Sequence, residues 1–450
     1  VLVDLGSGAL LSTGRVPSTV NTDVRLGIRA LRRSLLGGRV EPEVSLACSS
    51  AAGGLHIVAS GLVPNLTVQA ARQAALGAGG KVTHCFSYKL TADDLAVIGA
   101  ARPDIILLSG GTDGGDEAVL LANARALADG LAVQGTIVVA GNRVVSPEAV
   151  RILQTAGWDA VLTDNVLPEL SRIEAVKLRA LLRRLFLENI IKAKGIAAAA
   201  ELVDGVIMPT PSAVLAAAEV VTGRAGVPGL FTSACVVDVG GATTDVVSVS
   251  DIDPPSNFVR TGLDEPVVVR TVEGDLGVRH NADSILEMVG RPELPCLPIS
   301  LGELDLDAAL DAYRREPGMV PTDEAGIALD GFLTSAAVAE ASSRHAGTIE
   351  EVYVPGGPEV FRLRGKDLRS VPAIIGTGGP LTSRKDAAAL LSRACYDPAL
   401  PESLRPLKPE IYLDSDYLLF AVGLLSEDRP EVAVALARAS LRLSAASMTA

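Results

Sequence analysis

The stretch that decides the fold reads Cys235-Val236-Val237-Asp238-Val239-Gly240-Gly241-Ala242-Thr243-Thr244-Asp245-Val246-Val247-Ser248-Val249. Two apolar runs rich in β-branched residues flank a Gly-Gly-Ala turn with hydroxyl groups, which predicts a β-hairpin with a polar tip. Glycines let backbone N–H groups approach an anion closely, and a carboxylate such as Asp238 can hold a hydrated Mg²⁺. The alternative is an ordinary tight hairpin with a solvated aspartate.

Two other stretches carry related patterns near the ends of the chain. The N-terminus reads Val1-Leu2-Val3-Asp4-Leu5-Gly6-Ser7-Gly8, which repeats the order strand, aspartate, glycine, hydroxyl, glycine. Towards the other end, an apolar strand enters a glycine turn in Ala373-Ile374-Ile375-Gly376-Thr377-Gly378-Gly379-Pro380-Leu381, and a helix is expected over 385–392. Two aspartate-tipped hairpins that face one another, together with a Gly-Gly loop, predict a nucleotide-binding site.

Composition narrows the class of protein. A chain of 450 residues is long enough for two or more domains with sizeable cores. Hydrophobic residues make up 48% but aromatic residues only 3%, so small aliphatic side chains should fill the cores, as in helix-covered parallel sheets. The net charge is −13 without a lysine-rich run, and we therefore expect no nucleic-acid partner, because binding phosphates requires clustered Lys and Arg.

Cysteine and histidine spacing argues against a metal or disulfide framework. The five cysteines show no CxxC spacing, and the four histidines show no ligand spacing, so the thiols are expected to be buried hydrophobes in a reducing cytosol. No apolar run approaches the roughly 18 residues of a membrane span, and no signal peptide is visible. We therefore expect a cytoplasmic protein with no membrane partner.

Strict β/α alternation follows from residue 43. It predicts a parallel, doubly wound sheet inserted between the two aspartate hairpins. The loop Ser109-Gly110-Gly111-Thr112-Asp113-Gly114-Gly115-Asp116 is either the ligand or partner contact of this domain or a plain tight turn, and the two interpretations have equal weight. The expected strands are 55–59, 81–86, 105–109, 136–140 and 160–163, and the expected helices are 68–76, 92–100, 117–128 and 147–156.

Other patterns place the remaining elements. Helices are expected over 23–36, 167–190, 331–345 and 418–425, and a proline-punctuated turn at 205–212 should lead into a helix of small residues. Strands are expected at 351–354 and 360–363. The charged stretch 270–279 is interpreted as a solvated loop, with contact to a nucleotide or Mg²⁺ as the alternative. Ala421 and Gly423 should let the helix over 418–425 approach a neighbour closely.

The three glycine motifs, in this order and at this separation, resemble the phosphate 1, phosphate 2 and adenosine motifs of the actin, Hsp70 and sugar-kinase ATPase superfamily. The resemblance implies an actin-like (ribonuclease H-like) two-lobe α/β ATPase. Two features depart from it: the connection after Gly8 is short, and Met208 stands where the family commonly has a glutamate that positions the attacking water. Both features bear on hydrolysis more than on nucleotide binding.

The inserted domain also looks like a mutase-type cobalamin-binding domain, with a generic flavodoxin-like domain as the favoured alternative. The loop after its first strand reads Leu62-Val63-Pro64-Asn65 and lacks the histidine that ligates cobalt in such domains. We therefore expect no directly ligated cobalamin.

A narrower resemblance covers nearly the whole chain. The stretches 46–55, 109–116, 209–211, 271–277 and 375–381 together resemble the MutL/GlmL family of glutamate mutase accessory proteins, which is unrelated to the DNA-repair protein of similar name. This resemblance implies an ATP-dependent reactivating chaperone whose partners are the subunits of an adenosylcobalamin-dependent mutase. A small-molecule kinase of the same superfamily and a nucleotide-binding scaffold without turnover are the alternatives.

The superfamily resemblance also implies roles for individual residues. Asp4 and Asp238 would be the catalytic carboxylates and the Mg²⁺ ligands, Asp4 through water. ATP or ADP would contact the three glycine motifs, and Asp245 would support the second turn from behind. The nucleotide-binding residues would be Gly6, Ser7, Gly8, Gly240, Gly241, Ala242, Thr243, Thr244, Gly376, Thr377, Gly378 and Gly379.

The predicted domain organisation follows from these assignments. Residues 1–42 would form the first ATPase lobe with phosphate 1, interrupted by the inserted α/β domain over 43–166 and continued over 167–234. Residues 235–385 would form the second lobe with the phosphate 2 and adenosine motifs. The helices of 386–450 would close the lobes.

Overall fold

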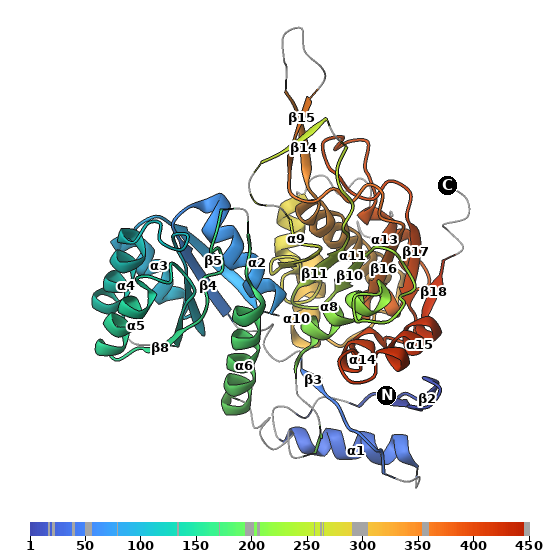
Figure 1. Cartoon of the computed structure of the whole chain (residues 1–450). Helices are drawn as coiled ribbons and strands as arrows, with labels where there is room; N and C mark the ends of the chain where they lie inside the picture. Colours follow the sequence, from blue (N-terminus) through green and yellow to red (C-terminus); the bar gives the residue numbers. More distant parts are fainter. Residues whose placement is uncertain are drawn as a thin grey trace. The chain divides into compact units, whose positions relative to one another are not determined.

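The computed structural model describes residues 1–16, 19, 23–37, 41–49, 56–78, 80–132, 135–170, 172–193, 202–204, 208–255, 257–261, 263, 265–289, 305–352 and 360–444. These residues form two compact units (Figure 1). The first unit comprises Val1–Cys48, Ala213–Val259 and Glu265–Ala450, and the second comprises Ser49–Ser212 and Arg260–Asp264.

A six-stranded sheet forms the centre of the first unit. The predicted hairpin is present, with Asp238 directly opposite Asp245. Strands β10, β16 and β17 run parallel, β11 runs antiparallel between β10 and β13, and β18 adds an antiparallel edge. The order is β13 (Val268–Glu273), β11 (Thr244–Val249), β10 (Ala234–Val239), β16 (Ala373–Thr377), β17 (Glu410–Asp414) and β18 (Leu441–Leu443).

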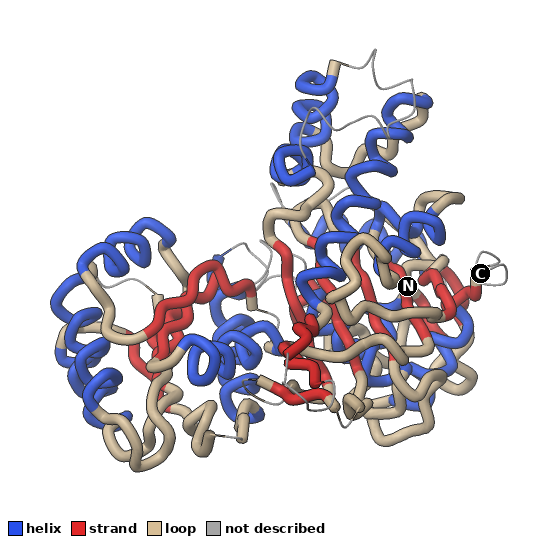
Figure 2. The backbone as a smooth tube through the Cα atoms, turned by 90° about the horizontal axis from the view of Figure 1, so that it is seen from above, coloured by secondary structure: helices blue, strands red, loops and turns tan. Residues whose placement is uncertain are grey.

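Alternating side chains of this sheet build two cores. Val237 and Ile374 belong to one core, while their neighbours Val236 and Ile375 belong to the other, as a pleated strand requires. Helices cover both faces (Figure 2). One face packs against α9 (Ala282–Val289), α10 (Leu306–Arg315), α11 (Glu324–His345), α12 (Gly379–Thr382) and α13 (Ala387–Leu391), and the other against α8 (Thr210–Val221), α14 (Leu419–Leu424) and α15 (Pro430–Ser440).

Smaller elements complete the first unit. The N-terminal hairpin is formed by β1 (Leu2–Val3) and β2 (Leu10–Ser12). Helix α1 (Val24–Leu36) begins where predicted, because the side chain of Asp23 accepts a hydrogen bond from the N–H of Arg25 at its N-cap. The remaining short elements are a three-stranded sheet of β12 (Phe258–Arg260), β15 (Val360–Arg364) and β14 (Thr348–Val352), and a 3₁₀ turn at Ser392–Ala394. The two-stranded sheet of β3 (Cys48–Ser49) and β9 (Met208–Pro209) lies outside the first unit except for Cys48.

The second unit is the predicted doubly wound domain. All five strands are parallel, and the third strand along the chain lies on the far side of the first from the second, the order known from flavodoxin-like folds. Its strand order is β5 (Lys81–Ser87), β4 (His56–Gly61), β6 (Ile105–Leu108), β7 (Thr136–Val139) and β8 (Asp159–Leu162). Helices α2 (Gln69–Gly77) and α6 (Val176–Ala193) cover one face, and α3 (Ala92–Ala101), α4 (Ala118–Gly130) and α5 (Ser146–Thr155) cover the other.

One predicted helix starts too early. The sequence predicted a helix from residue 167, but α6 begins at Val176. Asn165 accepts the N–H of Leu167, and the N–H of Glu174 returns to the carbonyl of Val166, so this segment forms a turn over the sheet instead of a helix. The predicted domain divisions stay predictions. The second compact unit runs to Ser212 and includes Arg260–Asp264, and α6 packs in its core, whereas the prediction assigned 167–234 to the first ATPase lobe.

Helices α8 and α14 touch backbone to backbone. A Cβ built on Gly423 would lie 1.8 Å from the carbonyl oxygen of Ala213, so only glycine fits there. The expectation that Gly423 allows a close approach is confirmed.

Several expectations lie partly or wholly outside the described residues: Cys296, most of the stretch 46–55, residues 205–207, the loop 292–298 and the strand end at 353–354. The other four cysteines are free. Among the described helices, none has the length and apolar character needed to cross a bilayer.

Candidate functional site

The carboxyl ends of three parallel strands gather polar groups at one edge of the first unit's sheet. Asp238 near the end of β10 is directly paired through the backbone with Thr377 at the end of β16, and Asp414 ends the next strand, β17. In open α/β sheets this edge is where ligands bind. The turn after β10 and the turn after β16 also touch here, since a Cβ on Gly378 would lie 2.8 Å from Oδ1 of Asp238 and 2.2 Å from the carbonyl oxygen of Val239.

The turn after β10 is held by its carbonyl groups. The carbonyl oxygen of Gly240 accepts the N–H of Val278 at 3.2 Å, and that of Gly241 accepts the N–H groups of Arg279 and His280 at 2.9 and 2.8 Å. The side chain of Asn281 donates to the carbonyl of Ala242 at 2.8 Å.

The N–H groups of the same turn make fewer hydrogen bonds than its carbonyl groups. Gly240 donates to the carbonyl of Thr243 at 2.9 Å and closes the turn. The N–H groups of Gly241, Ala242 and Thr243 donate to no acceptor in the described part of the chain. Adjacent backbone N–H groups without acceptors, in a turn, are the kind of donors that can bind an anion.

The hydroxyl groups of the turn are used internally. Thr243 donates to Oδ2 of Asp245 at 3.0 Å, so it supports the turn and can still accept a hydrogen bond. Thr244 is fully buried and donates to the carbonyl of Leu276 at 2.7 Å. The structure therefore does not bring the Thr244 hydroxyl to the site.

Asp238 lacks a compensating cation. Arg270 forms a buried ion pair with Asp245 at 2.5 Å, and both side chains are almost fully enclosed. Burial raises the pKa of Asp238 to about 7, with the carboxylates of Asp245 and Asp414 adding to the shift and Arg270 opposing it. No described residue donates a hydrogen bond to the Asp238 carboxylate. A divalent cation at this position would stabilise the charged form of the Asp238 carboxylate.

The sequence analysis did not single out Asp414, and its surroundings show that it organises the edge. Its carboxylate is fully buried and accepts the hydroxyl of Thr377 at 2.9 Å, the N–H groups of Leu418 and Leu419 at 2.8 and 3.0 Å, and the hydroxyl of Ser440. These bonds link β16, β17 and the start of α14. An Asp three residues before Tyr417 and the apolar run that follows was the only available signal.

The turn after β16 contains two different kinds of glycine. Gly376 lies within the strand and packs against Leu381 and Leu391, so the structure does not present it to a ligand. Gly378 adopts φ +95°, and Gly379 is exposed, with open space where a side chain would stand. This pair can let a flat group approach the backbone.

The N-terminal hairpin presents Asp4 differently. The carboxylate accepts the N–H groups of Gly6 and Ser7 at 3.3 and 3.2 Å and the hydroxyl of Ser7. The hydrogen bond from the Ser7 hydroxyl is the main cause that lowers the pKa of Asp4, so this exposed side chain is a carboxylate. Gly8 has φ +72°, and a Cβ there would lie 2.5 Å from Cβ of Ala435, which places the hairpin against α15.

No described hydrogen bond joins Asp4 to Asp238. The segment after β2 contacts the loop after β17 through Arg15, whose guanidinium lies over the ring of Tyr417 at 5.7 Å from its centroid. Tyr417 in turn donates its N–H to the carbonyl of Asp414 at 3.0 Å.

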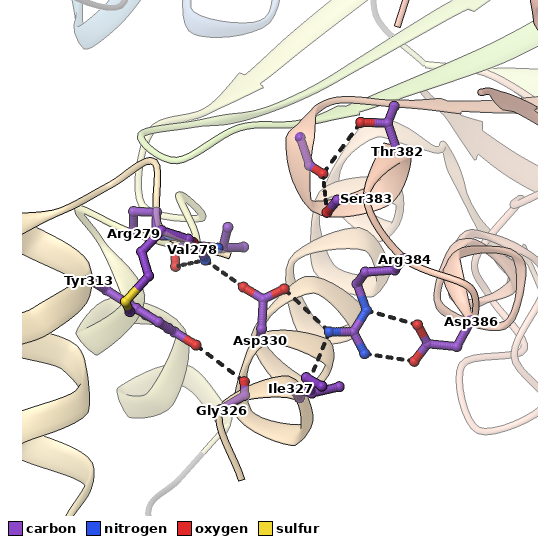
Figure 3. A network of polar contacts seen from close by, with 12 residues as sticks. Val278, Arg279, Tyr313, Gly326, Ile327, Asp330, Thr382, Ser383, Arg384 and Asp386 are labelled. Carbon is purple, nitrogen blue, oxygen red and sulfur yellow. Dashed lines mark hydrogen bonds and ion pairs between the residues drawn. The ribbon is translucent and has the colours of Figure 1, made fainter. Parts of the chain in front are cut away.

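The charged stretch 270–279 is not the solvated loop that the sequence favoured. The segment packs under the turn after β10. This packing buries Arg270, Glu273, Leu276 and Arg279. Figure 3 shows Arg279 stacked on Tyr313 at 4.4 Å and paired at 2.6 Å with Asp330, which also contacts Arg384 at 3.3 Å. The prediction failed because both arginine charges are neutralised by residues distant in sequence.

Comparisons with known proteins agree on one family. The model of the family described as MutL protein matches residues 1–441. A curated relative, "Protein MutL" of Clostridium tetanomorphum, is 40% identical over 437 residues, which cover 96% of this chain and 94% of that protein. The chain belongs to the MutL family. The family predicted from the sequence is thereby confirmed.

A solved structure described as nucleotide-free acetone carboxylase, from work titled "Mechanism of ATP-Dependent Acetone Carboxylation", is similar over 91% of this chain and 66% of that one. Its sequence identity is 12% and its TM-score is 0.32.

The glycine loop of the second unit in this MutL family member is tightly closed. The side-chain oxygen of Asn142 accepts the N–H of Gly114 at 3.0 Å, and its amide donates to the carbonyls of Gly115 and Asp116. Asn165 donates to the carbonyl of Gly111 at 3.0 Å. These contacts are those of a tight, cross-linked turn. Separately, among all described residues no group of three or more His, Cys, Asp or Glu side chains gathers in a metal-binding arrangement.

Proposed function

We propose that the chain binds MgATP at the carboxyl edge of the first unit's sheet and acts as an ATP-dependent reactivating chaperone of an adenosylcobalamin-dependent mutase, with glutamate mutase as the client. The observation that carries the nucleotide site is Asp238, a carboxylate without a cation, beside three open N–H groups of the turn over 241–243. The client follows from the resemblance to the MutL/GlmL family and from membership of the MutL family.

The strand arrangement supports an actin-like lobe. Three antiparallel strands, β10, β11 and β13, are followed by β16 and β17, which run parallel to β10 on its other side. Ribonuclease H-like lobes share this arrangement, which is an argument from fold analogy. In such a lobe the ligand edge is the one where Asp238 and Gly378 meet.

The residues present fit a hydrated Mg²⁺ with a triphosphate. Mg²⁺ takes one or two carboxylates and completes its shell with water and phosphate oxygens, so Asp238 can serve without a full protein cage. When bound, the ion would neutralise charge that develops on the phosphate oxygens.

The chain's own groups would do the rest. The N–H groups of Gly241, Ala242 and Thr243 would bind phosphate oxygens, and the Gly378–Gly379 turn would lie against the nucleoside. Asp4 would act through water, because its carboxylate already holds its own loop, and the Ser7 hydroxyl would reach a phosphate only after leaving Asp4. The backbone N–H groups of 241–243 are already in place, and preformed donors need no rearrangement when charge develops on the phosphate.

A second candidate is a nucleotide-binding scaffold without turnover. It is favoured by Met208, a buried thioether at the position where the resembling ATPases carry the water-positioning glutamate. A thioether is only a weak hydrogen-bond acceptor, so hydrolysis would need another group to orient water.

Calorimetric titration with MgATP, together with phosphate release measured with and without glutamate mutase, tests both candidates. The chaperone predicts ATP binding and phosphate release that the mutase stimulates, and the scaffold predicts binding alone. Asp238→Asn should lose binding, whereas Asp428→Asn, an exposed position in the turn before α15, should keep it. Absence of ATP binding by the natural chain contradicts the proposal, and ADP formation that depends on an added sugar or acid would indicate a small-molecule kinase.

A further inference from the structure

Arg15 is a cation placed beside the candidate nucleotide site without an anion of its own. It is exposed in the segment after β2, and no carboxylate in the described part of the chain forms an ion pair with it. Its contact is with an aromatic ring, because the guanidinium lies 5.7 Å from the centroid of Tyr417. A cation over a ring face is attracted by the ring's quadrupole and keeps its N–H donors available.

Tyr417, the residue under Arg15, adopts an uncommon backbone conformation. Its φ is +55°, in the left-handed region that a bulky residue rarely occupies. Its N–H donates to the carbonyl of Asp414 at 3.0 Å, and its ring packs on Phe420 at 5.8 Å. Strained positions of this kind persist where the surrounding structure demands them, and they cluster at functional sites.

The Tyr417 ring is anchored to the same edge as Asp238. Asp414 binds the Thr377 hydroxyl, and Thr377 is the backbone partner of Asp238. Burial raises the pKa of the Tyr417 phenol, and the charge of Asp238 adds to this effect, so the two side chains lie within electrostatic reach. Arg15 therefore contacts a ring that is anchored at the same edge of the sheet as Asp238.

We propose that Arg15, held on the Tyr417 ring, is a phosphate-binding residue of this edge, and the proposal rests on the nucleotide site proposed above. The edge carries the carboxylates of Asp238 and Asp414, which repel an anionic nucleotide unless cations accompany it. Mg²⁺ would supply one cation and Arg15 a second one, from the N-terminal segment that also carries Asp4. Arginine suits this role because its planar fork matches phosphate oxygens.

Calorimetric titration with MgATP at 50 and 300 mM KCl tests the assignment. Arg15→Ala should weaken ATP binding about tenfold at low salt, since bonds between charged groups are the strong ones, and by less at high salt because salt screens an exposed charge. Arg15→Lys should recover part of the loss. The control Arg364→Ala, at an exposed position of β15, should bind within about twofold of the natural chain.

The platform is tested by a double-mutant cycle. Tyr417→Phe keeps the ring and should bind ATP normally. Tyr417→Asn removes the ring while tolerating the left-handed backbone, and it should weaken binding in the same direction as Arg15→Ala, with little further loss in the double variant. Circular dichroism and thermal melting check that each variant is folded.

The outcomes separate the two proposals. If the natural chain binds ATP and Arg15→Ala binds it equally well, the Arg15 assignment is overturned and the nucleotide site stands. If the natural chain binds no ATP, both are overturned.

Discussion

The two aspartate-tipped hairpins look alike in sequence and differ in chemistry. The loop after β1 satisfies itself, because Asp4 accepts the N–H groups of Gly6 and Ser7 and the Ser7 hydroxyl. The turn after β10 is held by its carbonyls, and among the described residues three of its N–H groups and the Asp238 carboxylate have no hydrogen-bond partner.

This difference indicates which hairpin would supply most of the binding free energy at the proposed nucleotide site. A loop that already bonds its own carboxylate must break those bonds before it binds a ligand, which reduces the net gain. A preorganised turn with open donors pays no such cost. We therefore expect the second hairpin to dominate cation and phosphate binding, and the first to contribute modestly.

The largest expected effect is on the foundation of the second hairpin. Arg270→Ala leaves the buried Asp245 carboxylate unpaired opposite Asp238, and it should lower the free energy of unfolding by about 3–5 kcal/mol. Urea denaturation followed by circular dichroism measures this loss, with Arg364→Ala as the exposed control. A loss below about 1 kcal/mol would show that water reaches the pair and screens it.

The next effect separates the two aspartates. Asp238→Asn should weaken MgATP binding about 100-fold, because it removes the carboxylate proposed to contact the cation directly. Asp238 is here the ligand proposed to bind the cation directly, and Asp4 the one that acts through water. Calorimetric titration measures the change, with Asp428→Asn as the control. Equal losses for Asp238→Asn and Asp4→Asn would remove the distinction between the hairpins.

The pH dependence of binding sharpens the same distinction. Asp238 has a pKa near 7, so lowering the pH from 8 to 6 protonates the carboxylate that the cation needs. Affinity for MgATP should fall about tenfold over this range beyond the effect of ATP's own titration. Asp4→Asn should keep this dependence and Asp238→Asn should lose it. A dependence that survives in Asp238→Asn assigns it to another group.

Stability should show the opposite sign for Asp238. Its pKa is raised from 3.8 to about 7 in the folded chain, so the folded state binds the proton more tightly and loses stability as the pH rises from about 4 to 7. Asparagine does not titrate. Asp238→Asn should therefore be more stable than the natural chain at pH 8 by roughly 1–3 kcal/mol, and the difference should shrink below pH 5. Thermal melting across this range measures it, and a difference independent of pH would contradict the raised pKa.

The smallest effect is expected in the first hairpin. Asp4 faces water and is stabilised by local hydrogen bonds, so Asp4→Asn and Ser7→Ala should each change ATP affinity by about threefold to tenfold. The titration used for Asp238→Asn provides the comparison. A loss as large as 100-fold would mean that the loop opens and that Asp4 binds the cation directly.

Local signals predicted much of the fold. The hairpin over 235–249 was visible because apolar runs rich in β-branched residues flank a Gly-Gly turn, and β10 and β11 lie where expected. The strand and helix periods of the second unit placed all five of its strands within a few residues. Asp23 marked the start of α1 because its side chain acts locally.

Long-range partners were not predictable in the same way. The charges of Arg270 and Arg279 suggested exposure, but their carboxylate partners, Asp245 and Asp330, lie 25 and 51 positions away in the numbering. Asp414 and Arg15 join the site only because separate segments meet at one edge. Thr244 illustrates the reverse error, since its hydroxyl is bonded to the carbonyl of Leu276 inside the protein.

The contact of Gly423 with Ala213 couples α8 and α14 rigidly. With no side chain between the two backbones, neither helix can rotate or slide without losing contact along its whole buried side. If the start of α14, which is hydrogen-bonded to Asp414, were displaced, we would expect α8 to move with it. Even one added methyl group at position 423 would act as a wedge in this coupling.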